Sequence, residues 1–351
     1  MLQPHKKLYC LDVNHAPSFQ PFESAPIGIR LRSGDGESLE LLKNLNRSFA
    51  SSFGYSEGVF CNFSPTAVSF FIDQAVPSKE IIAFSSKLPY NLYHAGLILE
   101  KSGRTVLWID ADSAGGLCEK SLALAKERGA RYLVCSAVDE DTFYIESMKR
   151  VNRYFDMKHL ILDLSNALKL ENTPKVFAAF VWGYKVGSFK HSGVFLCSKC
   201  NFSDMIPAID LTVYDHFYHT YMKSANDSYD HIRNIRDCFV KQITDALGCR
   251  VKLMINPSLT LPNTCYIGFD GIFARDLIRS MALEGIFLTN GELCSLGLSQ
   301  PSRILKVIGY STEEASMAIS FSFGKMTHEE VESIGEKIIY KYRQLRAILV
   351  D

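Results

Sequence analysis

The chain alternates between short apolar runs and longer segments whose apolar residues recur every three or four positions. The short runs are bounded by glycine, proline and polar residues, which is typical of buried strands. The longer segments carry one apolar face, which predicts amphipathic helices. The predicted strands cover residues 8–12, 58–63, 80–84, 105–109, 132–138, 160–164, 176–182, 193–196, 251–255, 264–269 and 317–323.

Capping residues mark the ends of several predicted helices. Ser38 precedes an apolar stripe that reaches Phe53, and Gly54 follows as the stop. Thr327 and Glu330 have the spacing of a capping box before the last helix. Further helices are predicted over residues 90–102, 113–130, 228–247 and 274–284.

Length and composition describe an ordinary globular protein. A chain of 351 residues predicts two domains or one large α/β unit. The 38 basic and 38 acidic residues balance, so charge gives no case for nucleic acid or an anionic membrane as partner. The N-terminal apolar run is too short for a signal peptide, and no apolar stretch is long enough to span a bilayer. Ten cysteines without framework spacing then favour reduced thiols in a cytoplasm.

An acid and a lysine stand at the ends of neighbouring predicted strands. Asp163 lies near the end of the run 160–164, and Lys185 follows the run 176–182 in a turn flanked by Gly183 and Gly187. Polar groups at the ends of adjacent strands indicate a site. From residue types alone, a structural role is the commoner explanation for both side chains.

Metal-ligand patterns are weak. Cys197 and Cys200 form a lone CxxC without a second pair at metal spacing, and His216 and His219 lack further ligands in sequence. We therefore predict no metal site.

The stretch from Asp163 to Gly193 resembles fold-type I pyridoxal-phosphate enzymes of the class V aminotransferase group, and most of all the cysteine desulfurases. Those enzymes place an aspartate on the pyridine nitrogen and, one strand later, a lysine that forms the Schiff base. The resemblance implies pyridoxal 5'-phosphate as cofactor, Asp163 as the pyridine partner and Lys185 as the lysine. Lys190 is the runner-up for the lysine.

Three further cofactor contacts are implied by the same resemblance. Thr66 matches a threonine that binds the cofactor phosphate at a helix N-terminus, although Ser64 could simply cap that helix. Asn166 stands where the family has a glutamine after the aspartate. Tyr184 stands where a histidine binds the phosphate.

The C-terminal block from Gly285 to Gly309 has the closest match. Desulfurases carry here a small, glycine-flanked loop whose cysteine attacks the substrate sulfur, followed by a Pro-Ser motif. Cys294 occupies that position and is implied to be the nucleophile. The alternative is a small buried apolar residue.

Four positions depart from the family pattern. The stacking histidine is replaced by Leu88, unless Tyr90 or His94 has taken its role. The Asn-Glu-x-Gly motif that reaches the cofactor is replaced by the acidic stretch Asp139-Glu140-Asp141-Thr142, and a phosphate-binding serine is replaced by Trp182. The arginine that binds the substrate carboxylate is replaced by Ser320, which leaves Arg303 as the nearest basic residue in sequence.

The resemblance implies a fold-type I α/β architecture: a large domain over 15–225 with a mostly parallel seven-stranded sheet, and a small C-terminal α+β domain over 226–351, on which residues 1–14 pack. It implies a cytoplasmic homodimer that takes sulfur from cysteine, leaves alanine and a persulfide, and passes the sulfur to an acceptor or scaffold protein, as in iron–sulfur cluster assembly. Two alternatives stay open. One is a degenerate paralogue that serves as a scaffold subunit, and the other is a different class V reaction such as transamination.

Overall fold

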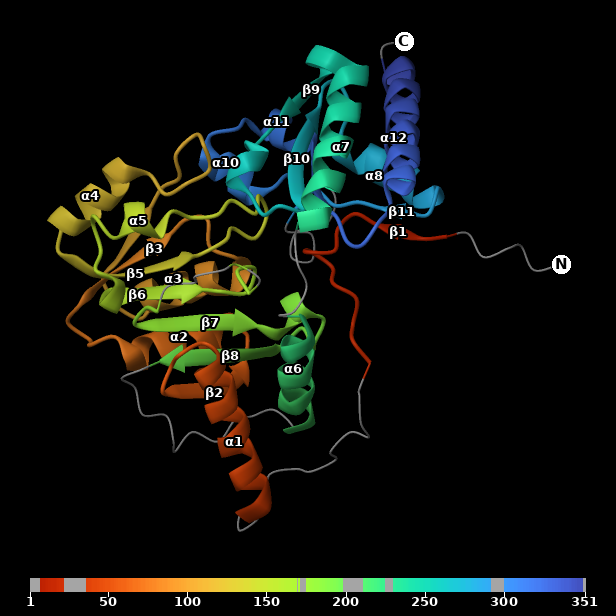
Figure 1. The fold of residues 1–351 in the computed structure, drawn as a ribbon. Coiled ribbons are helices and arrows are strands. Elements are labelled where there is room, and N and C mark those ends of the chain that lie inside the picture. Colours follow the sequence, from red (N-terminus) through yellow and green to blue (C-terminus); the bar gives the residue numbers. More distant parts are fainter. Residues whose placement is uncertain are drawn as a thin grey trace.

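The computed structural model describes residues 7–21, 36–168, 170, 175–197, 211–224, 230–291 and 300–349. Two units lie one above the other in Figure 1, a large one around a seven-stranded sheet and a smaller one around a three-stranded sheet. The predicted boundary at residues 225 and 226 lies outside the described residues.

The large sheet has the strand order β2-β8-β7-β6-β5-β3-β4. Strand β8 is antiparallel to both of its neighbours, and all other neighbouring pairs are parallel. The predicted mostly parallel seven-stranded sheet is therefore confirmed. The strands are β2 (Glu57–Asn62), β3 (Ile81–Ser85), β4 (Val106–Ile109), β5 (Ala130–Ser136), β6 (Leu160–Asp163), β7 (Ala178–Trp182) and β8 (Ser192–Cys197).

Helices cover both faces of this sheet, which explains why its strands are nearly continuous apolar runs. One face packs in a single hydrophobic core against α1 (Gly36–Ser52), α4 (Glu119–Glu127) and α6 (Leu211–Ser224). The other face packs in a second core against α2 (Pro65–Ala75) and α3 (Tyr90–Lys101).

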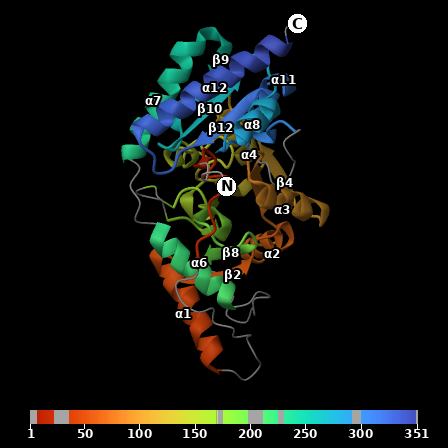
Figure 2. The same ribbon diagram turned by 90° about the vertical axis from the view of Figure 1, so that its right-hand side faces the viewer.

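The small unit has an antiparallel sheet in the order β12-β10-β9, covered by helices that share one core with it. Helices α7 and α12 lie side by side along it (Figure 2). The predicted capping box of α12 is present, because Thr327 N donates to Glu330 at 2.9 Å and Glu330 N donates to Thr327 Oγ1 at 3.2 Å. The elements are α7 (Asp230–Leu247), β9 (Val251–Leu253), β10 (Thr264–Phe269), α8 (Ala274–Leu283), α10 (Arg303–Ile308), α11 (Thr312–Ser316), β12 (Ala318–Ser322) and α12 (His328–Leu349).

Short elements connect these layers. They are α5 (Met148–Val151) and the 3-10 helices η1 (Met157–His159), η2 (Gly183–Val186), η3 (Gly248–Arg250) and η4 (Pro257–Leu259).

An N-terminal crossing segment, residues 9–20, runs from the small unit to the large one (Figure 1). Strand β1 (Tyr9–Cys10) pairs in parallel with β11 (Ile286–Phe287). Further along, Gln20 N donates to Gly187 O at 2.8 Å, next to the turn that carries Lys185. The crossing segment therefore connects the small unit with the predicted site.

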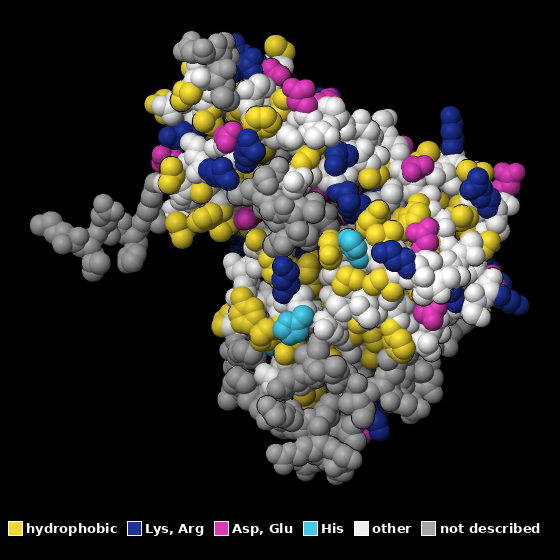
Figure 3. All heavy atoms as spheres, turned by 180° about the vertical axis from the view of Figure 1, so that it is seen from behind, with side chains coloured by type: hydrophobic (Ala, Val, Ile, Leu, Met, Phe, Trp, Pro, Cys, Tyr) yellow, Lys and Arg dark blue, Asp and Glu magenta, His cyan; other side chains and the backbone are white. Residues whose placement is uncertain are grey.

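The surface carries charges of both signs. On the face drawn in Figure 3, basic and acidic side chains are scattered among apolar and uncharged ones, in keeping with the zero net charge. Among the described helices, none combines the length and apolar character that crossing a membrane requires.

Candidate active site

The turn that carries Lys185 depends on two glycines. Strand β7 ends at Trp182, and the 3-10 helix η2 then presents Lys185 before Gly187 ends it with a φ of +85°. A Cβ at Gly183 would lie 2.1 Å from Ser192 Oγ, and one at Gly187 would lie 2.4 Å from Ser18 O. Only glycine lets this turn approach both β8 and the N-terminal crossing segment so closely.

We expect Gly187→Ala to destabilise the protein more than Gly103→Ala, a matched control. Gly103 has a similar φ of +95°, but nothing lies within 4 Å of a Cβ built there. The control should lose about 1 kcal/mol from its positive φ alone. Gly187→Ala should lose roughly 1–2 kcal/mol more, because its Cβ meets backbone. Urea unfolding curves measure both losses, and equal losses would contradict the close approach.

The amine of Lys185 is paired with a carboxylate from the acidic stretch that stands in place of the family's Asn-Glu motif. Its Nζ lies 2.9 Å from Glu140 Oε1, and the two side chains are only 3% and 10% exposed. The same nitrogen donates to Asn14 O at 3.3 Å. Glu140 comes from the loop after β5, so an acid at this position attracts the amine rather than an anionic ligand atom.

Asp163 is a buried carboxylate at the end of β6. Ser165 donates to its Oδ1 from both the backbone N at 3.0 Å and Oγ at 2.5 Å, and Ser136 Oγ donates to its Oδ2 at 3.2 Å. Among the described residues it forms no ion pair with a basic side chain. Burial raises the pKa of Asp163 to about 6, against the opposing effect of the Ser165 hydrogen bonds. A cationic ligand atom would lower that cost.

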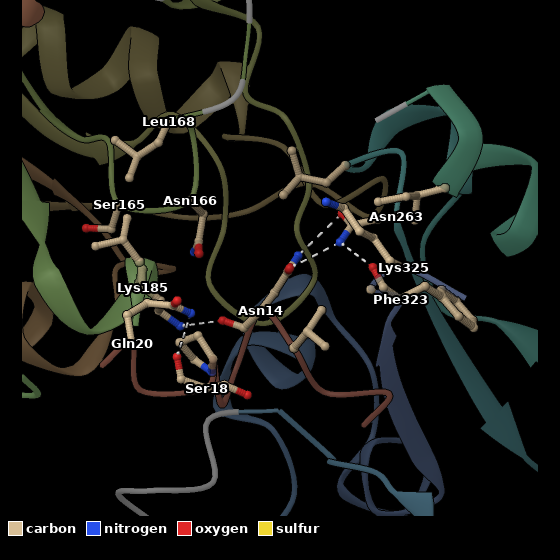
Figure 4. A pocket seen from close by; sticks show the side chains of 16 residues that line it. Asn14, Ser18, Gln20, Ser165, Asn166, Leu168, Lys185, Asn263, Phe323 and Lys325 are labelled. Carbon is tan, nitrogen blue, oxygen red and sulfur yellow. Dashed lines mark hydrogen bonds between the residues drawn. The ribbon is translucent and has the colours of Figure 1, made fainter. Parts of the chain in front are cut away.

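The lysine cavity, of about 290 Å³, is lined by Asn14, Ser165, Asn166, Lys185 and Asn263 among others. Figure 4 shows the side chains of Asn166 and Lys185 reaching into it from the large unit, opposite Asn263. The amide Nδ2 of Asn166 is buried and has no hydrogen-bond partner among the described residues. An unused buried donor of this kind is costly unless a ligand accepts from it.

The large cavity, of about 550 Å³, lies on the other side of the Lys185–Glu140 pair. Glu140 lines this cavity and Lys185 lines the other, so the ion pair stands between the two. The lining mixes hydroxyl, acidic, basic and aromatic groups. It includes Asp12, His15, Ser64, Tyr90, Glu140, Trp182, Tyr184, Lys190, His191 and Gly291.

Of the two residues predicted to bind the phosphate, Tyr184 and Thr66, only Tyr184 lines a cavity. Tyr184 lines the large cavity, whereas Thr66 is exposed and lines neither cavity. Ser64 lines the large cavity and also caps α2, because Ala67 N donates to its Oγ at 3.4 Å. Lys190 and His191 are basic groups at this cavity that lie just after the lysine turn.

Cys294 lies outside the described residues. Gly291, near the start of its loop, lines the large cavity.

Leu88, at one substituted position, and Arg303, the basic residue named for another, both have structural roles. Leu88 is fully buried in the core between the sheet and α3, so Tyr90, which lines the large cavity, is the aromatic residue left at this place. The guanidinium of Arg303 donates to the backbone carbonyls of Ser86 and Leu88. Arg303 therefore holds the loop after β3, and it lines neither cavity.

The structure adds a residue that sequence reasoning missed. His15, only 8% exposed, lines the large cavity, and its Nε2 lies 3.1 Å from Ser320 Oγ. Ser320 Oγ in turn donates to Asp141 O at 3.2 Å. Burial, and then the charge of Lys185, lower the pKa of His15 well below its usual value. The only feature of the sequence that points to His15 is its place just after the first predicted strand, residues 8–12.

Neither of the weak metal patterns gathers ligands. His216 is hydrogen-bonded to Ser188 and Gln20, and His219 pairs with Asp215. Cys200 lies outside the described residues. Within the part of the chain that the structure describes, no cluster of three His, Cys, Asp or Glu side chains could hold a metal.

Comparison with known proteins finds similarity to cysteine desulfurases, while no family model matches the chain. The chain is 30% identical over 122 residues to cysteine desulfurase IscS of Stutzerimonas stutzeri, which is 34% of this chain and 29% of that protein. It is 32% identical over 117 residues to IscS of Pseudomonas aeruginosa, or 32% and 28% of the two chains. The matched region thus spans less than a third of these relatives.

Solved structures show the same fold over nearly the whole chain. A NifS-like protein superimposes with a TM-score of 0.80 at 16% identity, covering 97% of this chain and all of that one. A NifS-like protein from Rickettsia africae gives 0.75 at 15% identity, covering 95% and 100%. The apo cysteine desulfurase from Thermococcus onnurineus gives 0.71 at 14% identity, covering 96% and 95%. The predicted fold-type I architecture and the resemblance to cysteine desulfurases are confirmed.

Proposed function

We propose that this chain, with the fold-type I architecture and its sequence similarity to cysteine desulfurases, is a pyridoxal-phosphate enzyme that removes sulfur from L-cysteine. The products are alanine and a persulfide on Cys294. The observation that carries the proposal is the buried Lys185 beside a cavity, one strand along the sheet from the buried Asp163.

Several residues around Lys185 have the chemistry that the cofactor requires. Asp163 has no basic partner among the described residues, which suits a carboxylate that faces a protonated pyridine nitrogen. Asn166 has an unused buried Nδ2 on the lysine cavity, which suits a ring oxygen as acceptor once binding of the cofactor at Lys185 displaces the Lys185–Glu140 pair that separates the two cavities. Tyr184, Ser64, Lys190 and His191 supply hydrogen bonds and positive charge for a phosphate at the large cavity.

The bound cofactor would supply an electron sink for negative charge that develops at the substrate α-carbon. Lys185 Nζ would hold the cofactor covalently and, once released, take the α-proton. Glu140 Oε1, at 2.9 Å, would keep that amine oriented and can accept its proton. The Cys294 thiolate would attack the substrate sulfur, so that the carbon–sulfur bond breaks while a sulfur–sulfur bond forms. The electron pair of the broken bond would stay with the substrate β-carbon, which takes up a proton to become the methyl group of alanine.

The first test is covalent cofactor capture. Wild-type protein with added pyridoxal phosphate is expected to show a visible absorption band that borohydride reduction fixes to the chain. Lys185→Ala should show neither band nor fixed label. Lys190→Ala, the runner-up, should still show both at saturating cofactor, because it removes a phosphate contact and not the covalent link. No fixed label in the wild type, even with excess cofactor, would overturn the enzyme proposal.

The second test separates binding from sulfur transfer. Cys294→Ser should keep the band and lose sulfide release from cysteine in the presence of a thiol reductant. Because serine cannot carry a persulfide, we expect a loss of at least about a hundredfold. Sulfide release at the wild-type rate would remove Cys294 from the mechanism.

A second function, a scaffold subunit without catalysis, is favoured by one observation. Ser320 holds no positive charge for a substrate carboxylate, and its hydroxyl already contacts Asp141 and His15. In that case the chain would bind a partner desulfurase or sulfur carrier and capture no cofactor. We also propose a homodimer and a sulfur-accepting protein, which analytical ultracentrifugation and persulfide transfer assays test.

A further inference from the structure

His15 is the histidine of the large cavity whose surroundings fix which ring nitrogen carries the proton. The Ser320 hydroxyl has one hydrogen, and it donates that hydrogen to Asp141 O at 3.2 Å. Ser320 Oγ can therefore only accept from His15 Nε2, 3.1 Å away. In the neutral ring, Nε2 then carries the hydrogen and Nδ1 keeps a free lone pair.

The orientation of the His15 ring is also fixed by packing. The edge of Phe143 packs on it, with ring centroids 4.9 Å apart and planes at 61°. Phe143 has a φ of 54° and is the one residue other than glycine with a positive φ in the described part of the chain. Such a conformation is strained for a residue with a side chain and persists where neighbouring contacts enforce it. The loop after β5 thus supplies both Asp141 O, which sets the tautomer, and Phe143, which sets the ring plane.

The ring that carries the free nitrogen lies on a cavity. His15 lines the large cavity, and no described residue forms a hydrogen bond with Nδ1. The titratable side chains on the same cavity are those of Asp12, Tyr90, Glu140, Tyr184, Lys190 and His191. Lys185, the partner of Glu140, also acts on the ring through its charge. Burial and Lys185 keep the ring neutral at physiological pH, because both lower the pKa of His15. A neutral imidazole offers a lone pair for a proton, and Leu88 at the family's histidine position does not. Burial and Lys185 oppose the resulting imidazolium, so the Asp12 and Glu140 carboxylates on the same cavity would have to offset its charge.

We propose that His15 Nδ1 is the proton acceptor of the large cavity, poised for a substrate that carries an ammonium or thiol group. The inference rests on the proposed function. A proton passes from the substrate N–H or S–H to Nδ1, and the electron pair stays on the substrate atom. The ring becomes an imidazolium whose Nε2–H still donates to Ser320. Ser320 acts as a positioning residue through the ring.

The tautomer can be measured without cofactor or turnover. In protein labelled with ¹⁵N-histidine, two-bond ¹H–¹⁵N correlation near neutral pH should give His15 a protonated Nε2 and an unprotonated Nδ1; His15→Gln identifies the signal. Ser320→Ala should add a second population protonated at Nδ1. A wild-type ring protonated at Nδ1, or at both nitrogens, overturns the proposal.

Chemical rescue tests the proton transfer. In cofactor-loaded protein, His15→Ala should lower kcat for sulfide release by about a hundredfold or more. It should keep the borohydride-fixed cofactor, and free imidazole should restore part of the rate. His216→Ala is the matched control, because that buried ring already uses Nδ1 on Ser188 and Nε2 on Gln20, and imidazole should have no effect on it.

A kcat of His15→Ala within a few-fold of wild type would overturn the role of His15 while leaving the proposed function intact. Absence of cofactor capture by the wild type would instead defeat the proposed function. The histidine spectrum then still decides whether Nδ1 is the free nitrogen.

Discussion

Asp163→Asn should make the cofactor-free protein more stable near neutral pH while abolishing its retention of the cofactor. The folded pKa of Asp163 is raised to about 6 by burial, against about 3.9 in an unfolded chain. The folded state therefore binds the proton more tightly, and this group's contribution to stability falls as pH rises from about 4 to about 6. The resulting cost near neutral pH is up to roughly 3 kcal/mol.

Asparagine removes the charge and keeps the hydrogen bonds. Its oxygen can accept from Ser165, and its amide can donate to Ser136 Oγ, which now donates to Oδ2. Urea unfolding should show a gain of roughly 1–3 kcal/mol near neutral pH that shrinks towards about pH 4. Exposed Asp156 is the control, since hydrogen bonds from Lys158 lower its pKa. Asp156→Asn should therefore reduce the stability near neutral pH, where Asp163→Asn raises it. A loss of stability in Asp163→Asn at both pH values would contradict the buried-charge explanation.

Removal of Lys185 alone should be more damaging to folding than removal of both members of the buried pair. Lys185→Met leaves the Glu140 carboxylate, 10% exposed, without its partner at 2.9 Å. Breaking such a pair costs about 3–5 kcal/mol, whereas replacing both charges by neutral groups is often close to neutral. We therefore expect the double variant Lys185→Met with Glu140→Gln to recover most of the stability that Lys185→Met loses.

A double-mutant cycle measures this coupling directly. The control cycle uses Arg131 and Glu80, a pair 3.1 Å apart whose arginine is 55% exposed, and it should show no more than about 1 kcal/mol. A coupling between Lys185 and Glu140 as small as that of the control would mean that water screens the pair. The two residues could then not stand as the wall between the cavities.

Site residues that lie close together in sequence could be predicted, whereas their partners from distant segments could not. Asp163 and Lys185 end neighbouring strands, and strand ends can be read from apolar runs. The partners that set their chemistry come from elsewhere, with Glu140 after β5, Asn14 and His15 before the first helix, and Ser320 on β12. The spacing of apolar residues does not indicate which side chains from distant segments come into contact. Only the fold shows that Glu140 pairs with Lys185.

Helix α6 is not among the helices predicted from the sequence, and the reason is local composition rather than long-range contact. Its sequence, Leu211–Ser224, is rich in tyrosine, histidine and threonine, which have low helix propensity. The stripe of Tyr214, Phe217 and Tyr221 nevertheless has helical spacing and is buried against the sheet. Tertiary packing therefore outweighs local preference here.

The contacts of the N-terminal crossing segment also determine which part of the site can fold last. Asn14 N donates to Ser322 Oγ across 308 positions of sequence, and His15 reaches Ser320 across 305. Contacts of such long range are slow to form, because closing the intervening chain costs entropy before they repay it. During synthesis on the ribosome the large sheet can assemble while β12 is still missing. The histidine end of the large cavity cannot form before β12 is available, so catalytic competence would be acquired only after β12 has emerged.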